Sequence, residues 1–203
     1  MKKFLLAAVL MLSSMAAFAQ HEVGTFTLQP KVGLNLATIT GKDVVEAKIR
    51  PAFVAGVEGE YQLADIFSLS AGVLYSQQGA KSKEEYVGLG KATLQFDYIN
   101  IPVMANVYVA QGLAVKVGAQ VGFNVRHKVK FGSTTFDIKD FGEEADDPIT
   151  FRKVDFSIPV GLSYEYSNVV IDARYNWGLT KLSKEDKSRN SVFQFTVGYK
   201  FEL

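Results

Sequence analysis

Histidine is the first residue type to weigh, because it is a frequent general base and metal ligand and the chain has only two. We expect His21 to lie in a mobile chain end. His127 falls on the lipid-facing side of an alternating segment, near its rim. A triad needs a hydroxyl and an acid on neighbouring strands at the same height, and the sequence identifies no such pair. We therefore predict no catalytic residues.

Clustered carboxylates are the second candidate, since they are the ligands that Ca²⁺ prefers. The acids between 137 and 147 lack the Asp-x-Asn-x-Asn-Gly spacing of a calcium loop. No cysteine, zinc motif or glycine-rich phosphate loop is present. We therefore predict neither a metal nor a cofactor. Three alternatives stay open for the basic segment 181–189: it pairs with this acidic loop, with lipopolysaccharide phosphates, or with neither.

Composition excludes several classes of protein. The 203 residues have a net charge of +1, so no strong field attracts nucleic acid. They are 48% hydrophobic and 21% charged, which excludes a disordered chain. No run reaches the roughly 18 apolar residues that a membrane helix needs.

The first residues are typical of a secretory signal peptide. Lys2 and Lys3 precede an apolar run, and Ala17-Phe18-Ala19 is a small-x-small cleavage motif. We predict a signal peptide over 1–19, cut before Gln20, followed by one barrel domain over 20–203.

The rest of the chain alternates apolar and polar residues with a period of two, which is the period of a β-strand. The clearest segment is 113–125, where every odd position is apolar. Short turns alternate with long connections, and we expect the long ones at 39–50, 79–92, 130–151 and 180–190. This alternation predicts an all-β fold: an eight-stranded antiparallel up-and-down barrel. The predicted strands lie at about 31–36, 53–61, 67–76, 94–109, 113–125, 154–165, 169–179 and 193–203.

The volume of the apolar face decides which face is outside. It includes many Phe, Tyr, Leu and Ile side chains, whereas an eight-stranded barrel is only just wide enough to be filled by side chains. The opposite face is rich in Gly, Ser, Asn and charge. We therefore expect the apolar face to meet lipid, as in a transmembrane barrel of the bacterial outer membrane. The long loops are then external and both termini periplasmic.

The inward face is charged, with six acids and six bases in balance. A selective water-filled pore would favour one sign, so balance predicts pairing across a narrow lumen. Asp172 and Arg174, two apart on one strand, are the expected centre. The predicted network is Glu58, Glu60, Lys116, Asp155, Asp172, Arg174 and Lys200, and the same face also has Lys31, Arg126, Lys128, Glu165 and Glu202.

Three pieces of sequence resemble a known family. They are the signal ending in Ala19-Gln20, the segment Tyr98-Ile99-Asn100-Ile101-Pro102-Val103, and the segment Asp172-Ala173-Arg174-Tyr175-Asn176-Trp177-Gly178-Leu179. These are similar to PorT-like outer-membrane β-barrel (porin-family) proteins of Bacteroidota. The resemblance implies an integral outer-membrane barrel and implies no functional residue.

Three functions fit this fold. The first is a non-enzymatic barrel that presents external loops for envelope integrity, adhesion or partner binding. The second is a narrow porin-like channel for ions or very small solutes, and the weakest is a lipid-modifying enzyme. The expected partners are outer-membrane lipid, lipopolysaccharide and envelope or extracellular proteins, without nucleic acid.

Overall fold

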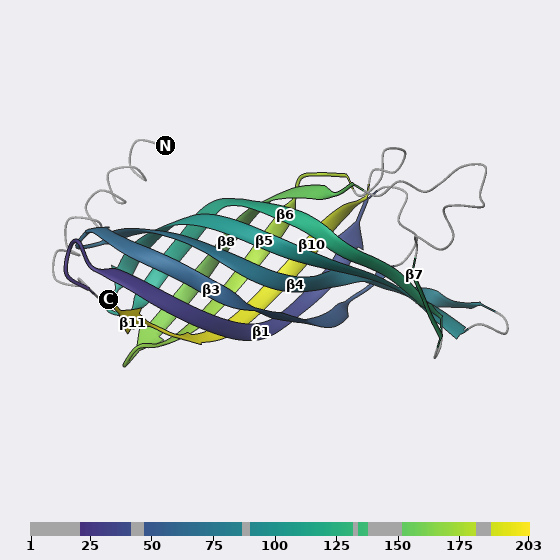
Figure 1. Cartoon of the computed structure of the whole chain (residues 1–203), viewed down its shortest axis with the longest axis horizontal. Coiled ribbons are helices and arrows are strands. Elements are labelled where there is room, and N and C mark those ends of the chain that lie inside the picture. The colour runs from purple at the N-terminus through teal and green to yellow at the C-terminus, as the bar shows by residue number, and fades with distance from the viewer. Residues whose placement is uncertain (1–20, 42–46, 87–89, 132–133, 138–151, 182–187) are drawn as a thin grey trace, which may run out of the picture.

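The computed structural model describes residues 21–41, 47–86, 90–131, 134–137, 152–181 and 188–203. Figure 1 shows their strands wound around one axis. Within these ranges no helix is long and apolar enough to cross a membrane. The strands are β1 (Phe26–Thr40), β2 (Ala47–Lys48), β3 (Arg50–Ala64), β4 (Phe67–Tyr86), β5 (Gly90–Ala110), β6 (Leu113–Phe131), β7 (Thr134–Asp137), β8 (Val154–Tyr166), β9 (Val169–Gly178), β10 (Arg189–Tyr199) and β11 (Phe201–Glu202).

Eight of these strands form a closed antiparallel barrel, as the sequence predicts. The order is β1-β3-β4-β5-β6-β8-β9-β10, and β10 pairs with β1 to complete the ring, with Leu34 opposite Phe195. Of the three short strands, β11 pairs with β1, β2 with β4 and β7 with β6. Closure leaves the barrel without an unpaired edge, which a sheet in lipid requires.

The short connections are two-residue turns at the end of the barrel where β1 begins. Ala64 pairs with Phe67, Ala110 with Leu113, and Tyr166 with Val169. The last turn has Ser167 and Asn168 at φ angles of 47° and 69°. Positive φ at both positions matches the twist of the two strands, as in type I′ hairpins.

The two faces of the wall differ as expected for a membrane barrel. Outward apolar side chains are exposed, with Leu34 at 58% and Leu162 at 52%. Inward positions are polar and buried, and Asn35, Ser76 and Gln194 are each 0% exposed. Without lipid this arrangement would leave a wide apolar surface in water, so the outward face is the lipid-facing one.

The predicted long loops need correction, because strands fill much of them. The loop expected at 79–92 is wrong: β4 runs on to Tyr86 and β5 begins at Gly90. β6 likewise reaches Phe131 and pairs with β7, and β2 lies inside the predicted loop 39–50. Figure 1 shows β4 to β7 running past the other strands, at the end opposite the C-terminus. Residues 138–151 and 182–187 of the other two loops are outside the described part of the chain.

Candidate functional site in the barrel lumen

The centre of the lumen contains a cluster of five charged side chains, which we call the central cluster: Lys31, Glu58, Lys116, Asp172 and Arg174. They come from four strands, β1, β3, β6 and β9. All face inward, because each occupies one of the alternating strand positions whose side chains are buried. Their side chains are at most 3% exposed.

Arg174 joins the two acids of the central cluster. Its Nε donates to Asp172 Oδ1 at 2.8 Å, and its Nη2 donates to Asp172 Oδ2 at 2.7 Å. The same Nη2 lies 3.2 Å from Glu58 Oε2, on a strand across the lumen. This forked contact is the arrangement in which a guanidinium binds carboxylates most strongly. The expected pair of Asp172 and Arg174 therefore lies at the middle of the lumen.

The two lysines complete the cluster from opposite walls. Lys116 Nζ lies 2.9 Å from Glu58 Oε1 and 3.2 Å from Asp172 Oδ2. Lys31 Nζ donates to Glu58 Oε2 at 3.0 Å. Three cations thus surround two carboxylates, and each carboxylate has partners on several strands. Sequence reasoning placed Lys31 on this face but left it out of the network.

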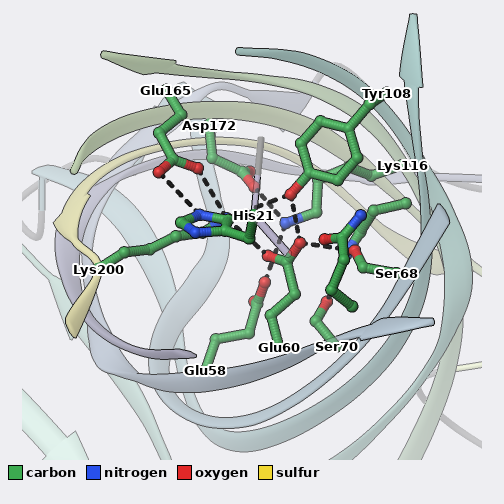
Figure 2. Close-up of polar contacts among 12 residues, drawn as sticks. His21, Glu58, Glu60, Ser68, Ser70, Tyr108, Lys116, Glu165, Asp172 and Lys200 are labelled. Atoms are coloured by element: carbon green, nitrogen blue, oxygen red, sulfur yellow. Dashed lines mark hydrogen bonds and ion pairs between the residues drawn. The ribbon is translucent and has the colours of Figure 1, made fainter. Parts of the chain in front are cut away.

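A second group, the lower cluster, comprises Glu60, Tyr108, Glu165 and Lys200, which Figure 2 shows inside the barrel. It lies toward the short-turn end, because β5 ends at Ala110 and β8 at Tyr166. Lys200 Nζ bridges Glu165 at 2.8 Å and Glu60 at 3.0 Å. Tyr108 and Ser68 both donate to Glu60 Oε1 at 2.5 Å. Two acids here face one lysine, whereas the central cluster has an excess of one base, so the two groups together are balanced.

Asp155 lies apart from both clusters. Its Oδ2 accepts a hydrogen bond from Asn190 at 3.4 Å, near the long-loop end. Asn190 also donates to the hydroxyl of Tyr98 at 3.2 Å. Of the seven residues predicted from the sequence, four are therefore in the central cluster and two in the lower cluster, and Asp155 belongs to neither.

Three of the charged residues predicted to face the lumen do not lie in it: Arg126, Lys128 and Glu202. Arg126 is 60% exposed in its side chain and lies 3.9 Å from Asp97. A bulge in the β5–β6 pairing between Asp97 and Tyr98 shifts the register and turns Arg126, and Lys128 two residues beyond it, outward. Glu202 is 61% exposed at the rim, although it lies on the expected parity. The side chain of His127 is outside the described part of the structure.

Polar satisfaction in the lumen is incomplete. In the part of the chain that the structure describes, twelve buried side-chain nitrogen or oxygen atoms have no hydrogen-bond partner, including Arg174 Nη1 and Asn35 Oδ1. The described residues also contain no group of three or more potential metal ligands. The chemistry of the lumen is therefore electrostatic: buried charges that hold opposite walls together.

The sequence predicts that His21 lies in a mobile chain end, and this prediction is wrong. His21 contacts the lower cluster instead. Its Nε2 lies 3.1 Å from Glu165 Oε1, and its Nδ1 lies 3.6 Å from Glu202 Oε2. The ring stands beside Glu165 and Lys200 in Figure 2, and its side chain is 9% exposed. Donation of a hydrogen bond from the His21 ring to the Glu165 carboxylate raises the pKa of His21 above its usual 6.5, against the opposing effect of burial.

This contact predicts a pH-dependent stability. A raised folded pKa means that protonated His21 contributes fully below pH 6.5, and that the contribution is lost as the pH rises through the folded pKa. We expect His21→Gln to lower the free energy of unfolding by about 1 kcal/mol at pH 5.5 and by less at pH 9. Urea titrations in detergent measure this, with Glu22→Gln on the exposed neighbour as the control. An equal deficit at both pH values would contradict the role of the charge.

Comparison with known proteins agrees with this architecture. Residues 18–184 match the family model described as outer membrane protein beta-barrel domain. No protein in the curated set matches the chain in sequence.

Solved structures of small barrels match nearly the whole chain. The attachment invasion locus protein Ail of Yersinia pestis is 17% identical, with a TM-score of 0.52 over 89% of this chain and 100% of that one. A second Ail structure, in complex with the heparin analogue sucrose octasulfate, is 18% identical with a TM-score of 0.51 and the same coverage. Neisserial surface protein A is 16% identical, with a TM-score of 0.55 over 87% and 97%.

The family model covers most of the chain, and the neighbours share its fold. Both agree with a closed antiparallel barrel. The chain belongs to the outer membrane protein beta-barrel domain family and is an integral barrel of the outer membrane.

Proposed function

We propose that this protein is a non-enzymatic barrel with a shut lumen, and that its function resides in the surface it presents outside the cell. The observation that supports this most is the burial of the central cluster. The side chains of Lys31, Lys116 and Arg174 are only 0–3% exposed, so the charges at the centre of the lumen contact one another and almost no solvent. The external end then serves envelope integrity, adhesion or partner binding. The complex of Ail with a heparin analogue supports an extracellular partner as one of these roles.

Conductance tests the shut lumen. We expect purified wild-type protein in planar bilayers to give no steady current, because charges from four strands meet across the centre. A large porin, which has a water-filled channel, reconstituted in the same way is the positive control. Steady channels from the wild-type protein would contradict the proposal and favour the narrow porin-like alternative.

We also propose that the long-loop end is external and both termini are periplasmic, with a signal peptide removed before Gln20. Short periplasmic turns and longer external loops are the rule in such barrels. The chain has no cysteine, so single cysteines can be placed at will. In intact cells we expect an impermeant maleimide to label Lys153→Cys and to spare Gln111→Cys until the outer membrane is broken. Labelling of Gln111→Cys in intact cells would reverse the orientation.

Within the outer-membrane family, we place the chain with the PorT-like proteins of Bacteroidota. The segments Tyr98–Val103 and Asp172–Leu179 support this assignment. Profile searches against PorT-like sequences test it: these two segments should align without gaps, and a better match to another group would overturn it.

A further inference from the structure

The outward face of the barrel changes from apolar to basic along β4 and β6. On β6, Phe123 and Val125 are 42% and 54% exposed and apolar, whereas the next outward side chain is Arg126. On β4, Val73 is 54% exposed and apolar, and Lys81 further along is exposed. A lipid-facing wall that ends in cations marks the level where hydrocarbon gives way to headgroups.

Above this level the strand register places three lysines in one row across the sheet. Lys48 of β2 pairs with Lys81 of β4, Lys81 pairs with Thr93 of β5, and Thr93 pairs with Lys130 of β6. Directly paired residues of antiparallel strands point to the same side of the sheet. We call Lys48, Lys81 and Lys130 the lysine row.

The opposite side of this extension is apolar, which keeps the lysine row outward. Ile39, Ala80, Phe96 and Tyr98 form a buried cluster, and Leu94 and Ala47 pack against it. The bulge that turns Arg126 outward also puts Val129 opposite Leu94. The extension is therefore a two-sided sheet with an inner core, and its basic side is on the surface that continues the lipid-facing wall.

The acids on this surface do not cancel the row. Asp97 is 5% exposed, and it accepts a hydrogen bond from Tyr75 at 2.7 Å and lies near Arg126. By backbone register Asp137 stands opposite Lys128 in the row below the lysines, and Glu85 stands opposite Lys91 in the row above, so each of these acids is matched by a lysine outside the row. Lys48 and Lys81 are exposed and Lys130 is half-exposed. Among the side chains that the structure describes on the surface above the apolar wall, positive charges thus outnumber negative ones.

We propose that the lysine row binds the phosphates of lipopolysaccharide in the outer leaflet. Lys130 is five residues beyond Val125, and at about 3.3 Å a residue on a strand tilted about 45° that is roughly 12 Å of height. This exceeds the roughly 5–8 Å of a phospholipid headgroup layer and suits a phosphorylated saccharide headgroup. Lysines near an anionic membrane surface attract it electrostatically.

Lipid is favoured over a soluble polyanion because the row continues the side wall. Exposed Val73 lies below exposed Lys81 on the same face of β4, so a headgroup with acyl chains can use both, whereas a soluble polyanion has no use for the apolar part. Binding by the lysine row deepens the proposed outward-facing function and rests on the membrane placement of the barrel, not on the closed lumen. The conductance experiment can therefore contradict the closed lumen without contradicting lipid binding, and the binding experiment can do the reverse.

The test is a titration of the full-length barrel in nonionic detergent with fluorescent deep-rough lipopolysaccharide. The variant combines Lys48→Gln, Lys81→Gln and Lys130→Gln. Each lysine near an anionic surface is worth about fivefold in affinity, so we expect about a hundredfold loss for three. Replacing the same three residues by arginine should retain binding. Heat-dependent migration on gels shows that each variant is folded.

A matched control removes three cations from the same rim but outside the row: Arg152→Gln, Lys153→Gln and Arg189→Gln. All three side chains are exposed. We expect this control to bind as the wild type does, and dephosphorylated lipopolysaccharide to bind the wild type as weakly as the row variant binds the intact lipid. Equal losses in both triple variants would overturn the proposal. Tighter binding of sucrose octasulfate than of lipopolysaccharide would overturn it in favour of a soluble polyanion.

Discussion

Replacing Arg174 by alanine is expected to lower the free energy of unfolding by about 3–5 kcal/mol. The guanidinium makes two hydrogen bonds to Asp172 and one to Glu58, and all three side chains are 1% exposed. Its loss leaves two buried carboxylates with only the lysines as partners. The cost of an incompletely paired buried charge exceeds what any surface ion pair contributes.

Urea titration in detergent, followed by gel migration without boiling, measures this loss. Arg189→Ala removes the same side chain from an exposed position on β10 and should unfold near the wild-type urea concentration. We also expect Arg174→Ala to admit a small current in planar bilayers, since it removes the side chain that joins Asp172 to Glu58 across the lumen. A variant as stable as the wild type, and as silent, would show that the central cluster neither supports nor closes the lumen.

The fold could be predicted from sequence because its determinants are local. A period of two identifies a strand in any short window, and the volume of the apolar face decides which side meets lipid. The charge pair of Asp172 and Arg174 was also accessible, since two residues apart on one strand share a face. The contacts with Glu58 were not, because they depend on which strands face each other across the ring.

The extended strands were missed because their pattern changes where the membrane ends. Most residues from 79 to 86 are polar or charged, so the segment resembles a loop. The inward positions near it, Ala80, Leu94 and Phe96, form an apolar cluster instead of a polar lumen. Predicting these strands requires the assumption that above the lipid the inward face becomes apolar and the outward face polar. A search for one continuous apolar face does not include that assumption.

Parity counting failed at Arg126, and distance along the chain hid His21. One extra residue in a bulge reverses every side chain beyond it, and no residue type marks the bulge in β6. His21 meets Glu165 across 144 residues of sequence. Nothing near either residue in the sequence announces that contact. The one available signal is the charge balance of the lower cluster. Its two acids, Glu60 and Glu165, share a single lysine, Lys200, which leaves room for a further cation.

Gly33→Ala is expected to destabilise the barrel by about 3 kcal/mol or to prevent its closure. Gly33 faces the lumen on β1, and a Cβ there would lie 1.9 Å from the carbonyl oxygen of Phe195 and 2.7 Å from Cα of Thr196. Both atoms are backbone of β10, paired with β1 at this register. These atoms cannot move away without breaking the β1–β10 hydrogen bonds that close the barrel, so the added methyl group directly opposes closure.

Gly59→Ala is the matched control on the neighbouring strand β3. Its Cβ would meet the ring of Phe26 at 2.8 Å, which is the far end of a side chain that can rotate toward lipid. We expect this variant to refold with the wild-type yield and to lose less than about 1 kcal/mol. Refolding yield into detergent and urea midpoints compare the two. If Gly33→Ala refolded as well as Gly59→Ala, the prediction would be wrong. The space between β1 and β10 would then accommodate a side chain, and their close approach would not require glycine at position 33.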